Sequence, residues 1–98
     1  MDLSKSKLKY IRSLKEKKYR TEFGTLVAEG NKLVTDLLPF IKCQLLIGTH
    51  TFLEGLDVSD VEDIIEITES QLAQASFLQN PQQVLAVFYY LHLHSLAA

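Results

Sequence analysis

Cysteine, proline and long apolar runs are scarce in this sequence of 98 residues, and two of these scarcities exclude a class of protein. The single cysteine, Cys43, cannot form an internal disulfide, and no cysteine–histidine spacing indicates zinc, so we expect a reducing compartment and a small core hydrophobe at Cys43. No apolar run is long enough to span a membrane, and lysines interrupt the N-terminal segment where a signal peptide has its apolar core. We therefore expect a cytoplasmic protein with no membrane partner.

The motifs of common catalytic and metal sites are also missing. The sequence has no P-loop, no GxGxxG and no nucleophile elbow. His92 and His94 have a spacing that zinc can use, but no third ligand is near, and a tail is the more usual explanation. A cluster of acidic residues lacks calcium-loop spacing and predicts a solvated loop: Asp57, Asp60, Glu62 and Asp63. We predict no catalytic, cofactor-binding or metal-binding residue.

Charge is divided unequally along the chain. Eight of the ten lysines and arginines lie at or before Arg20, where Asp2 and Glu16 are the only acids, so the first twenty residues carry a formal charge of +6. The remaining 78 residues hold two basic and ten acidic side chains, a formal charge of −8. This asymmetry predicts a polyanionic partner for the N-terminal end of the chain.

The basic segment has the pattern of an amphipathic helix that Ser4 or Ser6 can cap. Its apolar side chains are Leu3, Tyr10, Ile11 and Leu14. Lys5, Lys9 and Arg12 fall on the opposite face, and further lysines spread around the flanks toward the helix end: Lys15, Lys17 and Lys18.

Three interpretations of this helix remain open. Its cations can contact nucleic-acid phosphates, provide solubility only, or lie on an anionic membrane, although the apolar face is thin for a membrane once it packs on a sheet. The aromatic residues show no obvious stacking pattern, so sequence-specific readout of a single strand is not predicted.

The rest of the chain alternates between strands and helices. We expect strands over 25–28, 44–47, 64–68 and 84–93, and helices over 30–38, 50–56 and 69–78. The helix ended by Pro39 should bury Leu33, Val34, Leu37 and Leu38; the helix capped by Thr68 should bury Leu72, Ala75 and Ser76. The last strand is apolar on both faces, which predicts a central position. The alternation predicts an α/β layered sandwich with a mixed or largely parallel sheet.

Glu29-Gly30 follows the first predicted strand and has two possible roles. Glycine lets the backbone turn sharply or lets a ligand come close, and the next helix begins with free N–H groups beside Lys32 that favour an anion. A structural turn with a capping carboxylate is the commoner explanation.

Two strings in this sequence resemble one family. Lys9-Tyr10-Ile11-Arg12-Ser13-Leu14 and Lys17-Lys18-Tyr19-Arg20, followed by Phe23, Val27, Glu29-Gly30 and Lys32, resemble the opening of the N-terminal substrate-binding domain of SpoU/TrmH-type RNA 2′-O-ribose methyltransferases. Asn80-Pro81-Gln82-Gln83-Val84-Leu85-Ala86-Val87 is similar to the close of that domain. Together the strings bracket Lys5 to Phe88. Gln83 stands where the family usually has glycine, so the turn before the last strand can differ.

The resemblance implies a three-layer α/β/α sandwich with a mixed, largely parallel sheet, similar to kink-turn-binding ribosomal proteins. Residues 1–91 would form one RNA substrate-binding domain and 92–98 a tail. Its partners would be structured rRNA or tRNA, the catalytic domain of the same protein and possible second copies of the chain. The implied RNA-binding residues are Lys5, Lys9, Arg12, Lys15, Lys17, Lys18, Arg20, Glu29, Gly30 and Lys32.

In this family S-adenosylmethionine binds the catalytic knot domain, and nothing after Phe88 could form one. We therefore expect no cofactor and no turnover in this chain by itself. The alternatives are a free-standing RNA-binding protein, or a protein-interaction or dimerisation module whose basic face meets an acidic partner or the catalytic domain.

Overall fold

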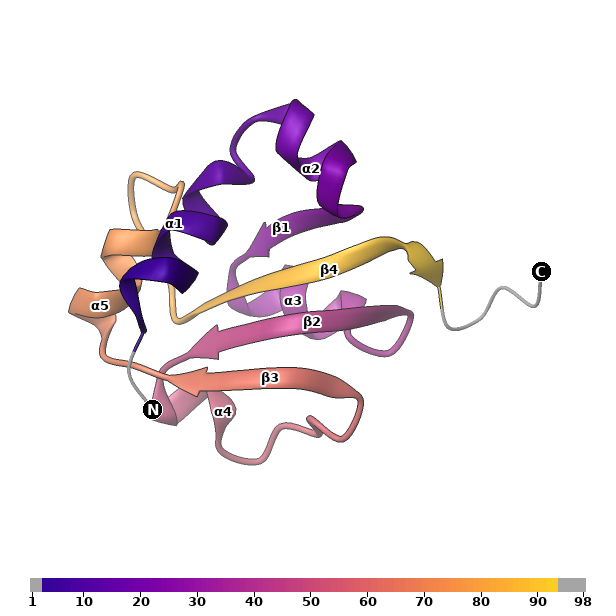
Figure 1. Ribbon diagram of the computed structural model, residues 1–98. Coiled ribbons are helices and arrows are strands. Elements are labelled where there is room, and N and C mark those ends of the chain that lie inside the picture. The colour runs from indigo at the N-terminus through magenta and orange to yellow at the C-terminus, as the bar shows by residue number, and fades with distance from the viewer. Residues whose placement is uncertain (1–2, 94–98) are drawn as a thin grey trace.

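The computed structural model describes residues 3–93, which form a four-stranded sheet with helices on both faces (Figure 1). The strands are β1 (Thr25–Glu29), β2 (Ile41–Gly48), β3 (Val61–Glu66) and β4 (Val84–Leu93). The helices are α1 (Lys5–Ser13), α2 (Lys17–Phe23), α3 (Asn31–Leu37), α4 (His50–Leu53) and α5 (Glu69–Ala75). The expected three-layer sandwich is confirmed.

The strand order is β1-β4-β2-β3, and the sheet is mixed, as expected. Strand β4 runs antiparallel to both β1 and β2, and β2 pairs in parallel with β3. The expectation of largely parallel pairing is wrong, because β4 returns between β1 and β2 and leaves a single parallel pair. The central position of β4 is confirmed: Val84 through Phe88 are at most 1% exposed.

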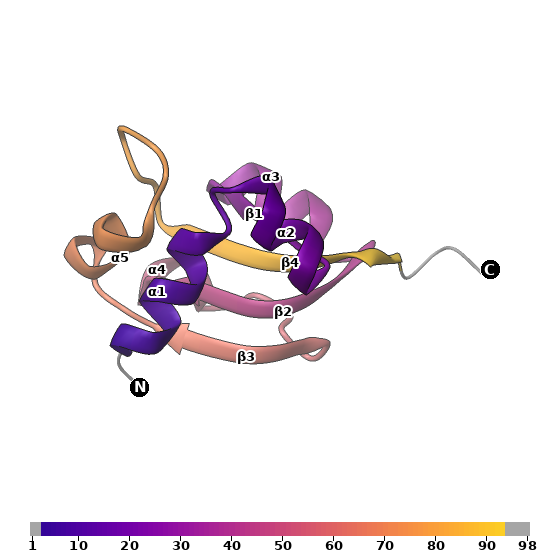
Figure 2. The same ribbon diagram turned by 45° about the horizontal axis from the view of Figure 1, so that its top comes forward.

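Each face of the sheet has its own apolar core. On one face, Ile11 and Leu14 from the α1 segment and Leu72 from α5 pack on Leu45 and Val87 of the sheet. On the other face, Val34 of α3 packs with strand residues, and the α4 segment covers the same cluster. Figure 2 shows α2 and α3 on opposite sides of β1, so the N-terminal helices and α3 belong to different layers.

The N-terminal segment contains two helices instead of the single basic helix that we predicted. Ser4 caps α1 by accepting a 3.1 Å hydrogen bond from the Lys7 backbone N–H. The chain then breaks at residues 14–16, where Leu14 is 1% exposed and enters the core. Helix α2 ends at Gly24, whose φ of +67° is in the left-handed region that glycine adopts freely.

Some predictions of burial, helix caps and strand boundaries are confirmed by the structure and others are wrong. Val34 is buried as expected, but Leu33 is 48% exposed, so the prediction for Leu33 is wrong. Thr68 caps α5 as predicted, in a capping box with Gln71. Glu62 and Asp63 lie in β3 and not in a solvated loop, because that strand begins at Val61.

The predicted range of the C-terminal strand, 84–93, is confirmed. Strand β4 runs to Leu93 and therefore includes His92, which was expected to begin a tail, whereas His94 and the rest of 94–98 fall outside the described residues. No helix within residues 3–93 is long and apolar enough to cross a membrane.

Candidate nucleic-acid interface

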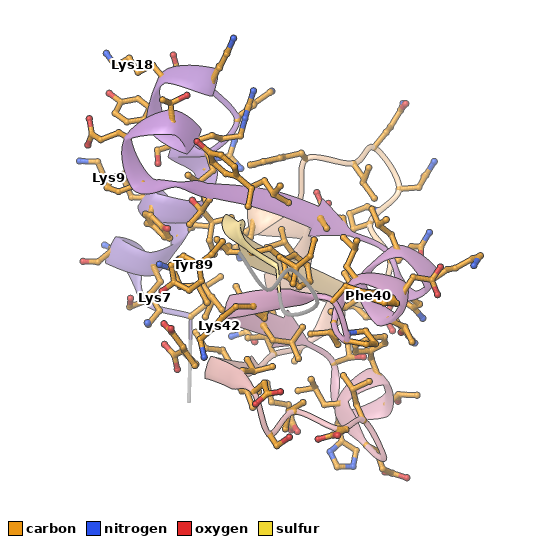
Figure 3. The ribbon with its side chains drawn as sticks, turned by 90° about the vertical axis from the view of Figure 1, so that its right-hand side faces the viewer. Lys7, Lys9, Lys18, Phe40, Lys42 and Tyr89 are labelled. Atoms are coloured by element: carbon orange, nitrogen blue, oxygen red, sulfur yellow. The ribbon has the colours of Figure 1, made fainter. Side chains whose placement is uncertain are left out.

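Six basic side chains lie exposed along α1, the break and α2. We call this set the basic face: Lys5, Lys9, Arg12, Lys15, Lys17 and Lys18. Figure 3 shows Lys9 and Lys18 extending from the two helices away from the sheet, toward the same side of the molecule. The break between the helices therefore does not separate the predicted cations.

The cations of the basic face remain available to an anion. Among residues 3–93, lysine ion pairs are confined to Lys7 with Asp63 at 2.6 Å and Lys32 with Asp36 at 2.8 Å, neither of which involves the basic face. Arg12 donates from Nη1 to the Gln74 carbonyl oxygen at 2.7 Å, which leaves other N–H groups of its guanidinium free to bind phosphate.

Arg20, also predicted to contact RNA, stabilises the helix break. Its Nη1 donates to the carbonyl oxygens of Leu14 at 2.9 Å and Lys15 at 2.7 Å. These carbonyls lie just past the end of α1, where no further turn of helix supplies a donor. The guanidinium therefore joins α2 to the end of α1.

The carboxylate of Glu29 binds protein groups. Its Oε1 accepts from the Ser76 hydroxyl at 2.5 Å, and its Oε2 accepts from the Phe77 backbone N–H at 2.7 Å. Both oxygens thus hold the segment that follows α5 against the end of β1. This geometry favours the structural explanation of the Glu-Gly pair.

Gly30 and Asn31 contact the segment over 80–87, so the two sequence segments that resemble the family lie next to each other in the fold. Gly30 has φ of +105°, and a Cβ at this position would lie 3.2 Å from Oε1 of Gln82. That same oxygen accepts from the Asn31 backbone N–H at 2.9 Å, while the Asn31 side chain bonds Gln83 at 3.0 and 3.3 Å. The first N–H of α3 is therefore occupied by a side chain of the protein, which favours the structural explanation of this turn over the anion site.

Gln83 adopts an ordinary backbone conformation. Every residue with positive φ in the described part of the chain is a glycine, so the turn before β4 does not require glycine at this position. The substitution instead supplies a side-chain oxygen that accepts from Asn31.

Lys32 lies apart from the basic face, on α3 at the other side of the sheet. Its ammonium donates to Asp36 one helical turn along, and this hydrogen bond raises the lysine pKa. Lys32 is fully exposed, so the pair adds little to stability.

Three aromatic residues come together where the sequence showed no stacking pattern. The rings of Tyr10 and Phe23 meet edge to face at 5.1 Å between centroids, and those of Tyr19 and Phe23 lie nearly parallel at 6.5 Å. These residues come from α1 and α2, and their contact depends on how the helices fold back on each other. Helical spacing within one helix could not reveal it.

A chain of polar side chains fixes α1 on the sheet. The Tyr10 hydroxyl donates to Oε1 of Gln44 at 2.6 Å, Nε2 of Gln44 donates to the Tyr89 hydroxyl at 3.2 Å, and that hydroxyl donates to Glu62 at 2.6 Å. The register of β2 on β4 shifts between Cys43 and Leu45, at Gln44. Figure 3 shows Tyr89 and Lys7 together on this side, and the bond to Glu62 raises the Tyr89 pKa.

The titratable groups elsewhere do not gather into a metal site. Within residues 3–93 no three histidine, cysteine or acidic side chains are placed to hold a metal ion.

Cys43 is 1% exposed, as expected of a core residue, and burial raises its pKa to about 12. His50 is exposed and lies 3.1 Å from both Glu54 and Glu66; its pKa is raised, chiefly by the bond to Glu66.

Comparison with known proteins identifies relatives that share this fold. Residues 5–86 match the family model of the MRM3-like substrate binding domain. A protein from Porphyromonas gingivalis assigned to the TrmH family of RNA methyltransferases is 35% identical, with a TM-score of 0.84 over 92% of this chain and 36% of that one. An rRNA methyltransferase from Sinorhizobium meliloti is 31% identical, with a TM-score of 0.74 over 89% of this chain and 34% of that one.

A second structure of a Sinorhizobium meliloti rRNA methyltransferase, with AdoMet bound, is 29% identical and superposes with a TM-score of 0.72 over 91% of this chain and 35% of that one. The chain thus spans about a third of the length of these proteins. A comparison with curated proteins finds no match.

Proposed function

Because the chain belongs to the family of MRM3-like substrate binding domains, we propose that it binds ribosomal RNA through its basic face and holds that RNA for a methyltransferase. Methyl transfer itself, to a ribose 2′-oxygen and with S-adenosylmethionine as donor, is assigned in this proposal to a catalytic domain outside residues 3–93. Support for the family comes from the sequence match and from the two relatives more than 30% identical.

The observation that carries the RNA-binding role is the one-sided placement of six exposed cations on α1, the break and α2. Each phosphate that a cation neutralises releases counterions, so several cations on one surface add their effects. The rest of the chain is formally negative, which directs a polyanion to this face and away from the others.

The loop over 76–83 lies beside both regions that were predicted to contact RNA, the basic face and the Glu29-Gly30 turn. Arg12 binds the Gln74 carbonyl just before it, and Glu29 and Asn31 bind residues within it. RNA lying on the basic face can therefore reach this loop and the edge of the sheet beside Gly30 without crossing to the α3 side.

The proposal assigns no cofactor to residues 3–93. The pocket beside Cys43 has a volume of about 250 Å³ and is lined by apolar and polar residues alike, among them Leu38, Ile41, Asp57 and Asp60. We derive no catalytic step from this chain.

Fluorescence anisotropy with a labelled helix–loop fragment of ribosomal RNA, titrated at several potassium chloride concentrations, tests the proposal. With four to six phosphates engaged, log K should fall with log salt at a slope of about −3 to −5. Lys9→Gln should reduce the size of that slope by about 0.7–0.9. Lys32→Gln removes the same charge from the α3 side and should change the slope much less.

Absence of binding, or binding that ignores salt, would contradict the proposal. Equal effects of the Lys9 and Lys32 substitutions would show that the basic face has no special role. Charge reversal at the exposed Lys17 and Lys18 separates RNA binding from protein interaction. A changed oligomeric state in light scattering with unchanged RNA affinity would favour the interaction module.

A further inference from the structure

An open groove runs between α1 and α2 across the basic face. Its volume is about 620 Å³, and its lining includes Tyr10, Tyr19 and Phe23 together with Lys9 and Arg12. Phe23 is 43% exposed, so part of its ring is open to solvent in this groove. Aromatic surface and positive charge thus meet within one groove.

We propose that this groove receives one unstacked base from a loop or bulge of the RNA, which stacks on Phe23 and Tyr19 while the flanking cations hold its phosphates. The inference rests on the proposed function and specifies how the RNA is held. Sequence-dependent recognition of RNA is directed chiefly at unpaired bases, which stack on aromatic side chains.

The ring geometry leaves surface for a base. Phe23 and Tyr19 are nearly parallel, at an interplanar angle of 18°, and Tyr10 meets Phe23 edge to face at 75°. Tyr10 therefore supports the Phe23 ring from the side and leaves part of that ring exposed. The Lys18 ammonium lies over the Tyr19 ring, 4.9 Å from its centre, which places a phosphate-binding cation against one of the aromatic residues of the groove.

The floor of the groove is held in place before any ligand arrives. The Tyr10 hydroxyl donates to Gln44 at 2.6 Å and lies 3.4 Å from the Thr25 hydroxyl, so the ring is attached to two strands of the sheet. Ser13 donates to the Tyr10 carbonyl oxygen at 2.6 Å, which fastens the same residue within α1. A site fixed in this way loses little conformational entropy when it binds.

Charge selects a nucleotide over an apolar peptide or a lipid chain as the occupant. Lys9 and Arg12 line the groove, Lys18 stands beside it, and Glu16 is its one acidic lining residue. A carboxylate at this place can accept a hydrogen bond from an exocyclic amino group of a base. The described lining of the groove includes no leucine, isoleucine, valine or methionine, the side chains on which an apolar peptide or a lipid chain would pack.

Tryptophan fluorescence tests the proposal directly, because the chain contains no tryptophan. Phe23→Trp places one reporter in the groove. Phe40→Trp is the matched control: Phe40 is 55% exposed and lies on the α3 side of the sheet in Figure 3. The probes are a single RNA strand of mixed sequence, the same strand annealed to its complement, and a ribose-phosphate strand of equal length without bases.

We expect the single strand to quench the tryptophan at position 23, the duplex and the base-free strand to quench it weakly, and none of the three to quench the tryptophan at position 40. Phe23→Leu, which keeps apolar packing, should weaken single-strand binding in anisotropy roughly tenfold and leave duplex binding and the salt slope unchanged.

Two results would overturn the base site while leaving the proposed function intact. One is equal quenching of the position-23 reporter by the base-free strand. The other is RNA binding by the Phe23→Leu protein with unchanged affinity for the single strand. If the unsubstituted protein binds none of the probes, the proposed function fails as well. Circular dichroism of each variant confirms that the fold is retained, so a loss of binding is not due to unfolding.

Discussion

The carboxylate of Glu29 accepts a 2.7 Å hydrogen bond from the backbone N–H of Phe77. This contact joins the end of β1 to the segment after α5, and the Ser76 hydroxyl adds a second bond to the same carboxylate at 2.5 Å. Hydrogen bonds to an ionised acceptor are short and strong, so Glu29 sets where the loop over 76–83 begins. That loop borders the basic face through Arg12.

Glu29→Ala should lower the free energy of unfolding by about 1–3 kcal/mol, because the Phe77 N–H loses its acceptor while partly buried. Urea unfolding followed by circular dichroism measures the change. The control is Asp60→Ala, an exposed acidic residue in the turn before β3, for which we expect a change within about 0.5 kcal/mol. Full stability combined with a large loss of RNA affinity would mean that the carboxylate faces the RNA.

Gly30→Ala should destabilise the protein more than Gly55→Ala. Both glycines have positive φ, +105° and +79°, so alanine is strained at either place. At Gly30 the added Cβ also meets Oε1 of Gln82 at 3.2 Å, whereas at Gly55 nothing lies within 4 Å. We expect about 1 kcal/mol for Gly55→Ala and about 1–3 kcal/mol more for Gly30→Ala.

The comparison of these two glycines isolates the contact with Gln82. Equal losses in urea unfolding would show that backbone strain alone explains both substitutions. Combining Gly30→Ala with Gln82→Ala provides a further check, since removal of the obstructing side chain should make the two changes less than additive.

Arg20→Ala and Lys17→Ala should affect different properties, although both remove a positive charge from α2. Arg20 bonds the carbonyl oxygens of Leu14 and Lys15, so its loss should cost about 1–2 kcal/mol in unfolding free energy. Lys17 is exposed, so its loss should leave stability within about 0.5 kcal/mol but reduce the salt slope of RNA binding by about 0.7–0.9. Equal stability losses would contradict the capping role of Arg20.

Local patterns in the sequence were sufficient to predict part of the fold. A run that is apolar on both alternating faces placed β4 at the centre of the sheet. The Thr68 cap was evident because a hydroxyl residue three positions before Gln71 can form a capping box, in which the side chain of each residue accepts from the backbone N–H of the other. The central strand and the helix cap each depend on a few consecutive residues, so the local sequence is enough to predict them.

Features that depend on contacts between distant residues were missed. The break after α1 is stabilised by Arg20, and the aromatic groove requires α2 to fold back until Phe23 reaches Tyr10. Likewise, the polar chain through Gln44 depends on an irregular register between β2 and β4. Neither helical nor strand periodicity contains these tertiary contacts, so six cations could be assigned to one surface while the aromatic site between them was not.

Cys43 should resist alkylation in the folded protein. Burial raises the pKa of this thiol to about 12, and Sγ donates to the Leu45 carbonyl oxygen at 3.3 Å. At pH 8 the thiolate fraction would be on the order of one in ten thousand, in addition to the steric protection of a side chain 1% exposed. Iodoacetamide labelling followed by mass spectrometry should be fast in urea and slow in buffer.

The labelling rate should also report how often the core around Cys43 opens. Val34 packs in the same cluster and is fully buried, so Val34→Ala should destabilise the protein by roughly 1–3 kcal/mol. If iodoacetamide reaches Cys43 through global unfolding, this loss of unfolding free energy increases the labelling rate by about 5- to 150-fold, because the population of unfolded protein rises by the same factor. An unchanged rate in Val34→Ala would mean that the reagent reaches Cys43 by a local opening, beside the pocket that Ile41 and Val61 line.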